Sequence, residues 1–278
     1  MKKQRKITDI FIYFILTIGS LFMIGPLLWM ITTSLKDKTG VFALPPQWIP
    51  DPFQFDAYIK LFQLDTLGYG LKNTIIVSLT VTIIGTITSS MAAFAFAKLR
   101  MPFKNTLFLI LLASIMIPYP IIMIPQFVMF SKMGWVDTLL PLIVPGLFGN
   151  ITMIFFLRQY LTNVPYSLIE AAKVDGAGYL QIFFKLIFPV IRPAVAAQFI
   201  LWFMGVWNDY LAPLIYLNSP EKQTLQVVIA NLKATYAIQT DYPLIMAGSV
   251  VSLLPVLIVF LIFQKQIIES VALSGVKG

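Results

Sequence analysis

Thr74-Ile-Ile-Val-Ser-Leu-Thr-Val-Thr-Ile-Ile-Gly-Thr-Ile-Thr-Ser-Ser-Met-Ala-Ala-Phe-Ala-Phe-Ala97 decides the fold, because this stretch contains no charged side chain. A helix that crosses a bilayer needs about 20 mostly apolar residues, and the stretch meets that length. Five further segments are mostly apolar over a similar length, at residues 10–31, 107–130, 139–157, 194–217 and 244–263. We therefore predict an all-α integral membrane bundle of six transmembrane helices, formed by residues 1–278 as a single domain.

The composition supports this prediction. Hydrophobic residues make up 58% of the chain and charged residues 12%, whereas soluble domains carry about 25% charged residues. The sequence has no cysteine and no histidine. Disulfides and thiolate metal sites are thus excluded, and the side chain most often used as a general base near neutral pH is missing. A water-soluble enzyme and a disordered chain are both poor fits.

The distribution of charge predicts the orientation in the membrane. A basic head, Lys2-Lys-Gln-Arg-Lys6, precedes the first span, and no small-residue cleavage pattern follows it, so we interpret the span as a retained helix. With both termini cytoplasmic, most of the 20 Lys and Arg residues fall on the cytoplasmic side. The net charge of +8 is then a topology signal, and nucleic acid is not an expected partner.

The spans are poor in groups that could drive transport or catalysis. Asp209, next to Asn208, is the one acid inside a predicted span. It fits an interfacial acid beside belt aromatics or a polar lining of a translocation pathway, and Asn208 and Asp209 are candidate pathway residues on the second reading. A single acid provides neither an ion relay, as a secondary carrier needs, nor the clustered groups of a membrane enzyme. No phosphate-binding Gly-x-x-x-x-Gly-Lys-Ser/Thr loop occurs either, so energy for uphill transport must enter through another subunit.

Prolines and small residues indicate where the predicted spans bend and where they pack closely. Pro118, Pro120 and Pro125 lie in the third span, and Pro141 and Pro145 lie at the start of the fourth. Each is expected to kink or break its helix, either for packing or to line a cavity. Gly85 and Ser89 in the second span permit close approach of another helix, within the chain or from a second subunit.

The predicted cytoplasmic loop, residues 158–193, carries its own helix signals. Ser167-Leu-Ile-Glu170 has the capping-box pattern, and Gly176 stands where a left-handed residue ends a helix, which predicts a helix over Leu168–Asp175. A second helix is predicted over Tyr179–Phe188, before Pro189 and Pro193. Glu170 fits a plain capping partner or a charged contact with another protein.

Glu170-Ala171-Ala172, followed after three residues by Gly176 and later by Pro189, resembles the EAA loop of ABC importer permeases. The family pattern ends Ile-x-Leu-Pro, whereas this chain has Leu186-Ile-Phe-Pro189. Further segments resemble the carbohydrate branch of maltose-type permeases: Leu44-Pro-Pro-Gln-Trp48, Asp175-Gly-Ala177, Trp207-Asn-Asp-Tyr210 and the tail Gly275-Val-Lys-Gly278.

The resemblance implies an ABC type I importer permease fold and the smaller of two permease subunits. Glu170 would make a polar contact with an ATP-binding subunit, Ala171 and Ala172 would pack closely against it, and Gly176 would form the turn. Asp175 and Pro189 belong to the same ATPase-coupling motif.

The implied assembly contains a second permease in a heterodimer, an ATPase dimer that binds ATP and Mg, and an extracytoplasmic solute-binding protein. This chain holds no cofactor or metal and is not an enzyme. It works among lipid in the bacterial cytoplasmic (inner) membrane. The implied substrate is a carbohydrate, an oligosaccharide or a related polyhydroxylated solute. A permease for a non-sugar solute and, less readily, a secondary carrier remain as alternatives.

Overall fold

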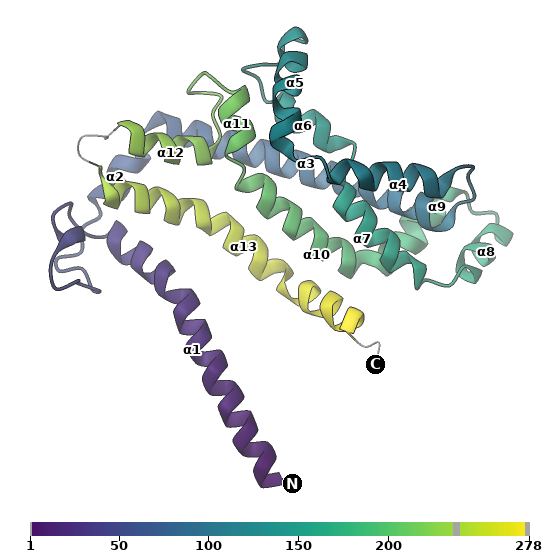
Figure 1. The fold of residues 1–278 in the computed structure, drawn as a ribbon, viewed down its shortest axis with the longest axis horizontal. Coiled ribbons are helices and arrows are strands. Elements are labelled where there is room, and N and C mark those ends of the chain that lie inside the picture. The colour runs from purple at the N-terminus through teal and green to yellow at the C-terminus, as the bar shows by residue number, and fades with distance from the viewer. Residues whose placement is uncertain (1, 236–239, 276–278) are drawn as a thin grey trace. The chain divides into compact units, whose positions relative to one another are not determined.

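The computed structural model describes residues 2–235 and 240–275, and these form helices joined by short connections, without a β-strand among them (Figure 1). The long helices are α1, α3, α10 and α13, and the connections hold many short ones. The elements are α1 (Lys2–Ser34), η1 (Gly40–Phe42), α2 (Asp56–Phe62), α3 (Asp65–Lys98), α4 (Lys104–Ile115), α5 (Tyr119–Lys132), α6 (Leu140–Leu147), α7 (Ile151–Thr162), α8 (Ser167–Val174), α9 (Tyr179–Ile182), η2 (Phe183–Ile187), α10 (Phe188–Trp207), α11 (Leu211–Tyr216), α12 (Leu225–Thr235) and α13 (Tyr242–Gly275).

The chain forms two compact units. Unit 1 consists of Met1–Gly68 with Val228–Leu254, and unit 2 consists of Tyr69–Val227 with Pro255–Gly278. The boundaries fall within α3, α12 and α13. Both candidate functional regions lie in unit 2. Of the tail named above, residues 276–278 lie outside the described residues.

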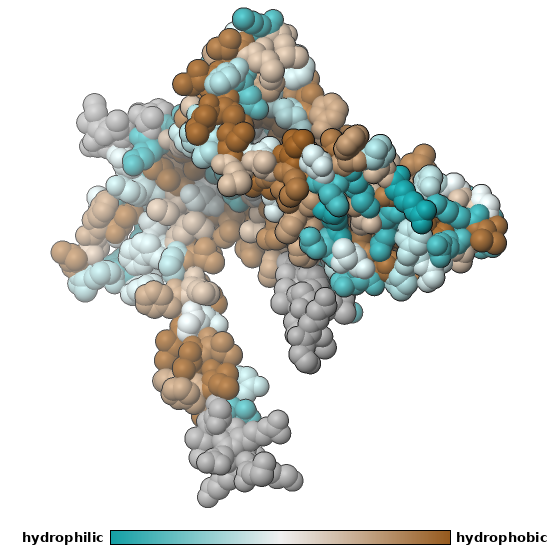
Figure 2. Space-filling model, turned by 45° about the vertical axis from the view of Figure 1, so that its right-hand side comes forward, coloured by the Kyte–Doolittle hydropathy of each residue, from teal (hydrophilic) through white to brown (hydrophobic). Residues whose placement is uncertain are grey.

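Unit 1 is built on the end of α1. Trp29 of α1 packs edge-on against Trp48, with ring centroids 5.2 Å apart, and the Lys36 ammonium lies 4.2 Å from the Trp29 ring centroid. Lys38 forms an ion pair with Asp241 at 2.9 Å. The earlier part of α1 exposes apolar side chains, such as Phe22 and Met23, over its surface, brown in Figure 2. Such a surface suits lipid or a second membrane subunit.

The helices agree with most of the predicted spans. Among the described residues, five helices are long and apolar enough to cross a membrane, or six if the bent pair α4 and α5 counts as one span. The third predicted span is not continuous, since α4 and α5 meet at 96° around Ile117 and Pro118. Pro118 precedes α5 in an extended conformation, which explains the break.

The fifth predicted span, 194–217, is wrong at its second half. The spanning helix runs from Tyr179 to Trp207, and α11 is a separate short helix. The expected break before Pro189 is also absent, because α9, η2 and α10 continue into one another. The turn η2 is π-helical, and this altered hydrogen-bond pattern falls where Pro189 lacks an N–H.

The break between α6 and α7 shows how the fold satisfies freed backbone groups. The Thr88 hydroxyl donates to the Leu147 carbonyl at 2.9 Å, and the Asn150 N–H donates to the Ser89 hydroxyl at 2.8 Å. Irregular backbone at membrane depth is tolerated where it is buried in protein, as here, or lines a water-filled cavity. The prediction that Ser89 permits close approach is confirmed, with the approaching helix coming from the same chain.

Gly85 marks a close contact between helices in unit 2. A Cβ at this position of α3 would lie 2.5 Å from the Gly146 carbonyl oxygen and would overlap the Trp202 ring. Only a residue without a side chain allows α3 to meet α6 and α10 here.

Candidate functional site

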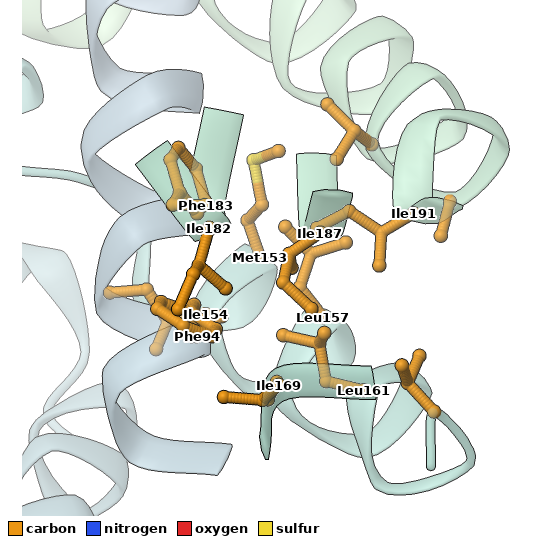
Figure 3. Packing of buried hydrophobic residues seen from close by; sticks show 14 of the residues in the cluster. Phe94, Met153, Ile154, Leu157, Leu161, Ile169, Ile182, Phe183, Ile187 and Ile191 are labelled. Carbon is orange, nitrogen blue, oxygen red and sulfur yellow. The ribbon is translucent and has the colours of Figure 1, made fainter. Parts of the chain in front are cut away.

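The predicted motif helix exists as α8, and one side chain anchors it. Ile169 is completely buried and packs into a cluster formed by α3, α7, α9, η2 and α10 (Figure 3). In Figure 3 it points toward the cluster that contains Leu157 and Leu161 of α7. A helix of this length is marginal in water on its own, so this burial is what holds it.

The start of α8 differs from the prediction. Tyr166 already has helical angles and packs against the cluster, so it takes the N-cap position, and the predicted cap Ser167 becomes the first helical residue. The capping box with Glu170 is therefore wrong. The Glu170 backbone N–H donates instead to the Tyr166 carbonyl at 3.2 Å, and its side chain is exposed.

The end of α8 agrees with the prediction. Gly176 has φ +82°, its N–H donates to Lys173, and the Ala177 N–H donates to the Ala172 carbonyl at 2.9 Å. These are the two bonds of a Schellman motif. Nothing lies within 4 Å of a Cβ built on Gly176, so the backbone conformation, and not a steric contact, is what requires glycine.

The remaining motif residues form an exposed surface. Glu170, Ala171 and Asp175 are exposed, and Val174 is 88% exposed. Ala172 is half-buried and packs against the cluster, so the two alanines do different things. We define the α8 face as the surface formed by Glu170, Ala171, Val174 and Asp175.

Cationic side chains fasten the α8 region to its neighbours. The Lys173 ammonium donates to the Tyr179 hydroxyl at 2.9 Å, which joins α8 to α9 and raises the pKa of Lys173. Lys98 at the end of α3 donates to the Val164 carbonyl at 2.6 Å. Figure 2 shows hydrophilic residues gathered over the end of unit 2 that holds α8. This end is a polar, well-anchored platform.

The second candidate pair, Asn208 and Asp209, lies at the other end of α10. Asp209 lines a cavity of about 170 Å³, whereas Asn208 is exposed and accepts from the Gln226 amide at 3.1 Å. The two consecutive side chains thus have different surroundings. Both lie far from α8, because α10 lies between and its 20 residues span about 30 Å. Pro189 lies exposed near the α8 end of that helix.

The cavity includes residues that the sequence did not single out. They come from α3, α5, α6, the α10–α11 segment and the approach to α12. The full lining is Thr74, Val77, Tyr119, Gln126, Pro141, Leu142, Pro145, Val206, Asp209, Ala212, Pro213, Tyr216 and Thr224. A polar Gln126 inside an apolar segment was the signal available in the sequence.

Hydrogen bonds between Asp137 and residues 216–219 join two connections beside the cavity. We call this set of hydrogen bonds the latch. Asp137 has φ +62°, and its carboxylate accepts from the Asn218 N–H at 2.9 Å, the Ser219 N–H at 2.8 Å and the Ser219 hydroxyl. Its own N–H donates to the Tyr216 carbonyl at 2.7 Å. The hydrogen bonds from Ser219 hold the pKa of Asp137 below its usual value.

These features define a helical membrane protein of the permease class: apolar spans, a short exposed helix on a polar connection, and a small cavity at the far end of the same helix. The chain belongs to the family of binding-protein-dependent transport system inner membrane components, whose model matches residues 85–272. It is therefore a subunit of a transport system in a membrane.

Relatives and a solved structure agree with this membership. The chain is 33% identical to the arabinooligosaccharides transport system permease protein AraQ of Halalkalibacterium halodurans, over 99% of this chain and all of the relative. It is 29% identical to the lactose transport system permease protein LacG of Rhizobium radiobacter, over 99% and 98%. A chain of a bacterial ABC transporter involved in the import of the acidic polysaccharide alginate superposes with a TM-score of 0.81 at 24% identity, covering 94% of this chain and 96% of that one. The predicted importer permease fold is confirmed.

Proposed function

We propose that this chain is one of two permease subunits of an ATP-driven importer for a carbohydrate. The α8 face is the observation that carries the proposal. It presents a carboxylate, a small side chain and an 88% exposed valine on a helix pinned from behind by Ile169, which is an arrangement suited to docking on another protein. The similarity to permeases for arabinooligosaccharides and lactose supports a carbohydrate as the solute.

In this proposal an ATP-binding subunit docks on the α8 face. Glu170 makes the polar contact, Ala171 allows close approach and Gly176 keeps the end of the helix in place. Asp175 lies at the edge of the contact. Ala172 packs α8 against the cluster of unit 2. The two alanines therefore have different roles, whereas the resemblance implied that both pack against the ATP-binding subunit. ATP and Mg are bound by the partner, and this chain is not an enzyme.

The continuous helix from Tyr179 to Trp207 then connects docking with the solute pathway. Closure of the ATPase dimer moves α8, the π-helical turn η2 absorbs part of the change, and α10 carries it as a rigid element toward Asp209. A second permease completes the pathway, and an extracytoplasmic binding protein delivers the solute. The chain crosses the bacterial cytoplasmic membrane with both termini inside.

A crosslinking experiment tests the docking. The chain has no cysteine, so Ala171→Cys introduces its single thiol. Inside-out native membranes are treated with a thiol-to-amine crosslinker, and the adduct is identified by mass. We expect capture of an ATP-binding subunit from Ala171→Cys and much less from Thr162→Cys, an exposed position at the end of α7.

The alternatives make different predictions in the same membranes. Efficient labelling of Ala171→Cys without capture of an ATPase would contradict the docking and favour a secondary carrier. Uptake that persists after ATP is removed would do the same. A panel of saccharides and other solutes separates the remaining alternative. Import of a non-sugar solute alone would leave the assignment as an importer permease intact and contradict a carbohydrate as the solute.

A further inference from the structure

We infer that the cavity beside Asp209 binds one neutral sugar ring of the transported solute, so that this subunit itself selects uncharged saccharides against acidic ones. The inference rests on the proposed import of carbohydrate. It adds a binding site for the solute and a preference of that site for uncharged saccharides. The volume of about 170 Å³ leaves room for several water-sized groups, and so for a single sugar ring.

The walls of the cavity match the two surfaces of a sugar. Val77, Leu142, Pro141 and Pro145 supply apolar area for the C–H face. Polar groups then fix the orientation of the hydroxyls, as in small-molecule sites generally, and here they are the carboxylate of Asp209 and the side chains described next.

Tyr119, Tyr216 and Gln126 form a loosely bonded polar row. The Tyr119 hydroxyl donates to the Tyr216 hydroxyl at 3.3 Å, and Tyr216 donates to the Gln126 side-chain carbonyl at 3.4 Å. O–H···O bonds are normally 2.5–3.0 Å long, so these are weak and can be exchanged for bonds to a ligand. The Tyr216 ring itself is fixed, because it stacks on Phe127 with planes 9° apart and meets Phe130 edge-on.

Thr224 gives independent evidence that the cavity takes a polar ligand. Its side chain is 4% exposed, lines the cavity, and its hydroxyl has no hydrogen-bond partner among the described residues. Buried polar groups are almost always paired, and an unpaired one requires an explanation. A sugar hydroxyl in the cavity would supply the missing partner.

The carboxylate of Asp209 determines the preference of the cavity for uncharged solutes. It is the one charged side chain among the described residues that line the cavity, and in the described part of the chain no cation pairs with it. Its carboxylate accepts a long bond, 3.4 Å, from the Ala212 N–H and a further backbone bond from Leu211. An ionised carboxylate is an acceptor that strengthens hydrogen bonds from hydroxyl donors, and it repels a second anion at close range. A uronate or a phosphate ester is therefore excluded.

Protection of an introduced thiol tests the site in the assembled transporter. Ala212→Cys places a thiol in the cavity, and Leu214→Cys, two residues further on α11 and outside the lining, is the matched control. Membranes containing the complete complex are treated with a small thiol reagent, with and without lactose, diacetylchitobiose or arabino-oligosaccharides. ATP-driven uptake of the same solutes is measured in parallel. Glucuronate and glycerol 3-phosphate are the anionic probes.

We expect a neutral saccharide that the complex imports to slow labelling of Ala212→Cys about tenfold when it is present at about ten times its dissociation constant. Labelling of Leu214→Cys should not change, and the anions should not protect. Asp209→Asn and, separately, Thr224→Val in the Ala212→Cys background should each weaken protection.

Several results would overturn the site while leaving the proposed function intact. These are ATP-driven saccharide uptake without protection of Ala212→Cys, protection by glucuronate as strong as by a neutral sugar, or a thiol that resists the reagent because a second permease covers the cavity. A complex that imports no saccharide at all would instead contradict the proposed function, and the site would fall with it.

Discussion

The two ends of α10 carry the two candidate sites, and they are built in opposite ways. At the α8 end, the functional residues lie close together in sequence, on one short helix and its C-cap, and depend on the buried Ile169 and the left-handed Gly176. At the cavity end, the residues come from α3, α5, α6 and α11 and converge only through tertiary packing. A few neighbouring residues of one helix can form a docking surface, whereas a pocket for a small solute needs walls from several helices.

The largest expected effect comes from the anchor of α8. Ile169→Ala removes a completely buried side chain, and such changes cost about 2–5 kcal/mol. Because Ile169 is the one completely buried side chain of α8, and Ala172 and Lys173 make weaker contacts, we expect the helix to detach locally, with loss of ATP-driven uptake. Leu168→Ala, at a neighbouring side chain that is 40% exposed, is the control. Hydrogen exchange of the amides of α8 in the purified complex measures the detachment, and equal exchange in the two variants would contradict the anchor.

A smaller loss is expected from the glycine that ends α8. Gly176→Val forces a β-branched residue into φ +82°, at a cost of about 1–3 kcal/mol, which corresponds to a loss of the competent conformation of about fivefold to 150-fold. Gly178→Val is the matched control, since Gly178 has φ −72° and nothing lies near its Cβ position. Uptake and ATP hydrolysis are compared in proteoliposomes. If Gly178→Val uncouples the two as strongly, the backbone argument fails.

The latch beside the cavity is expected to contribute about 1 kcal/mol, because its hydrogen bonds are charge-assisted but lie near the surface. The pKa of Asp137 is lowered in the folded state, so its stabilisation is present above the ordinary carboxyl pKa of about 3.9 and is lost as the pH falls below it. The melting temperature of Asp137→Asn should therefore lie below that of the unaltered protein at pH 7 and converge with it in acid.

Ser219 provides the control for that experiment, since it donates to the same carboxylate. In a double-mutant cycle, Ser219→Ala should lower the melting temperature much less when Asp137 is already Asn. Additive effects of the two changes, or a difference that persists unchanged at pH 3, would show that the latch does not stabilise through the ionised carboxylate.

The sequence predicted the spans and α8 well because their signals are local. Apolar length marks a membrane helix, and Gly176 marks a helix end through its own backbone. The wrong details have local causes that only packing reveals: Tyr166 is drawn into the cluster and displaces the cap by one residue, and the π-helical turn η2 lets the helix continue past Pro189. The cavity was predicted only in part: the sequence indicated Asp209, Pro141 and Pro145 as possible lining residues. It did not indicate their partners, since Tyr119 and Thr224 are far apart in sequence and nothing in either one indicates the other.

The smallest effect is expected next to the cavity, at a residue that the sequence could not distinguish from Asp209. Asn208 is exposed, donates to the Met204 carbonyl at 2.9 Å and accepts from Gln226. Exposed hydrogen bonds contribute little, so Asn208→Ala should change saccharide uptake by less than about twofold. Asp209→Asn, which removes the charge from the cavity, should reduce it clearly more. Initial uptake rates in the same membranes compare the two, and equal losses would mean that the adjacent residues act together and that the cavity does not separate them.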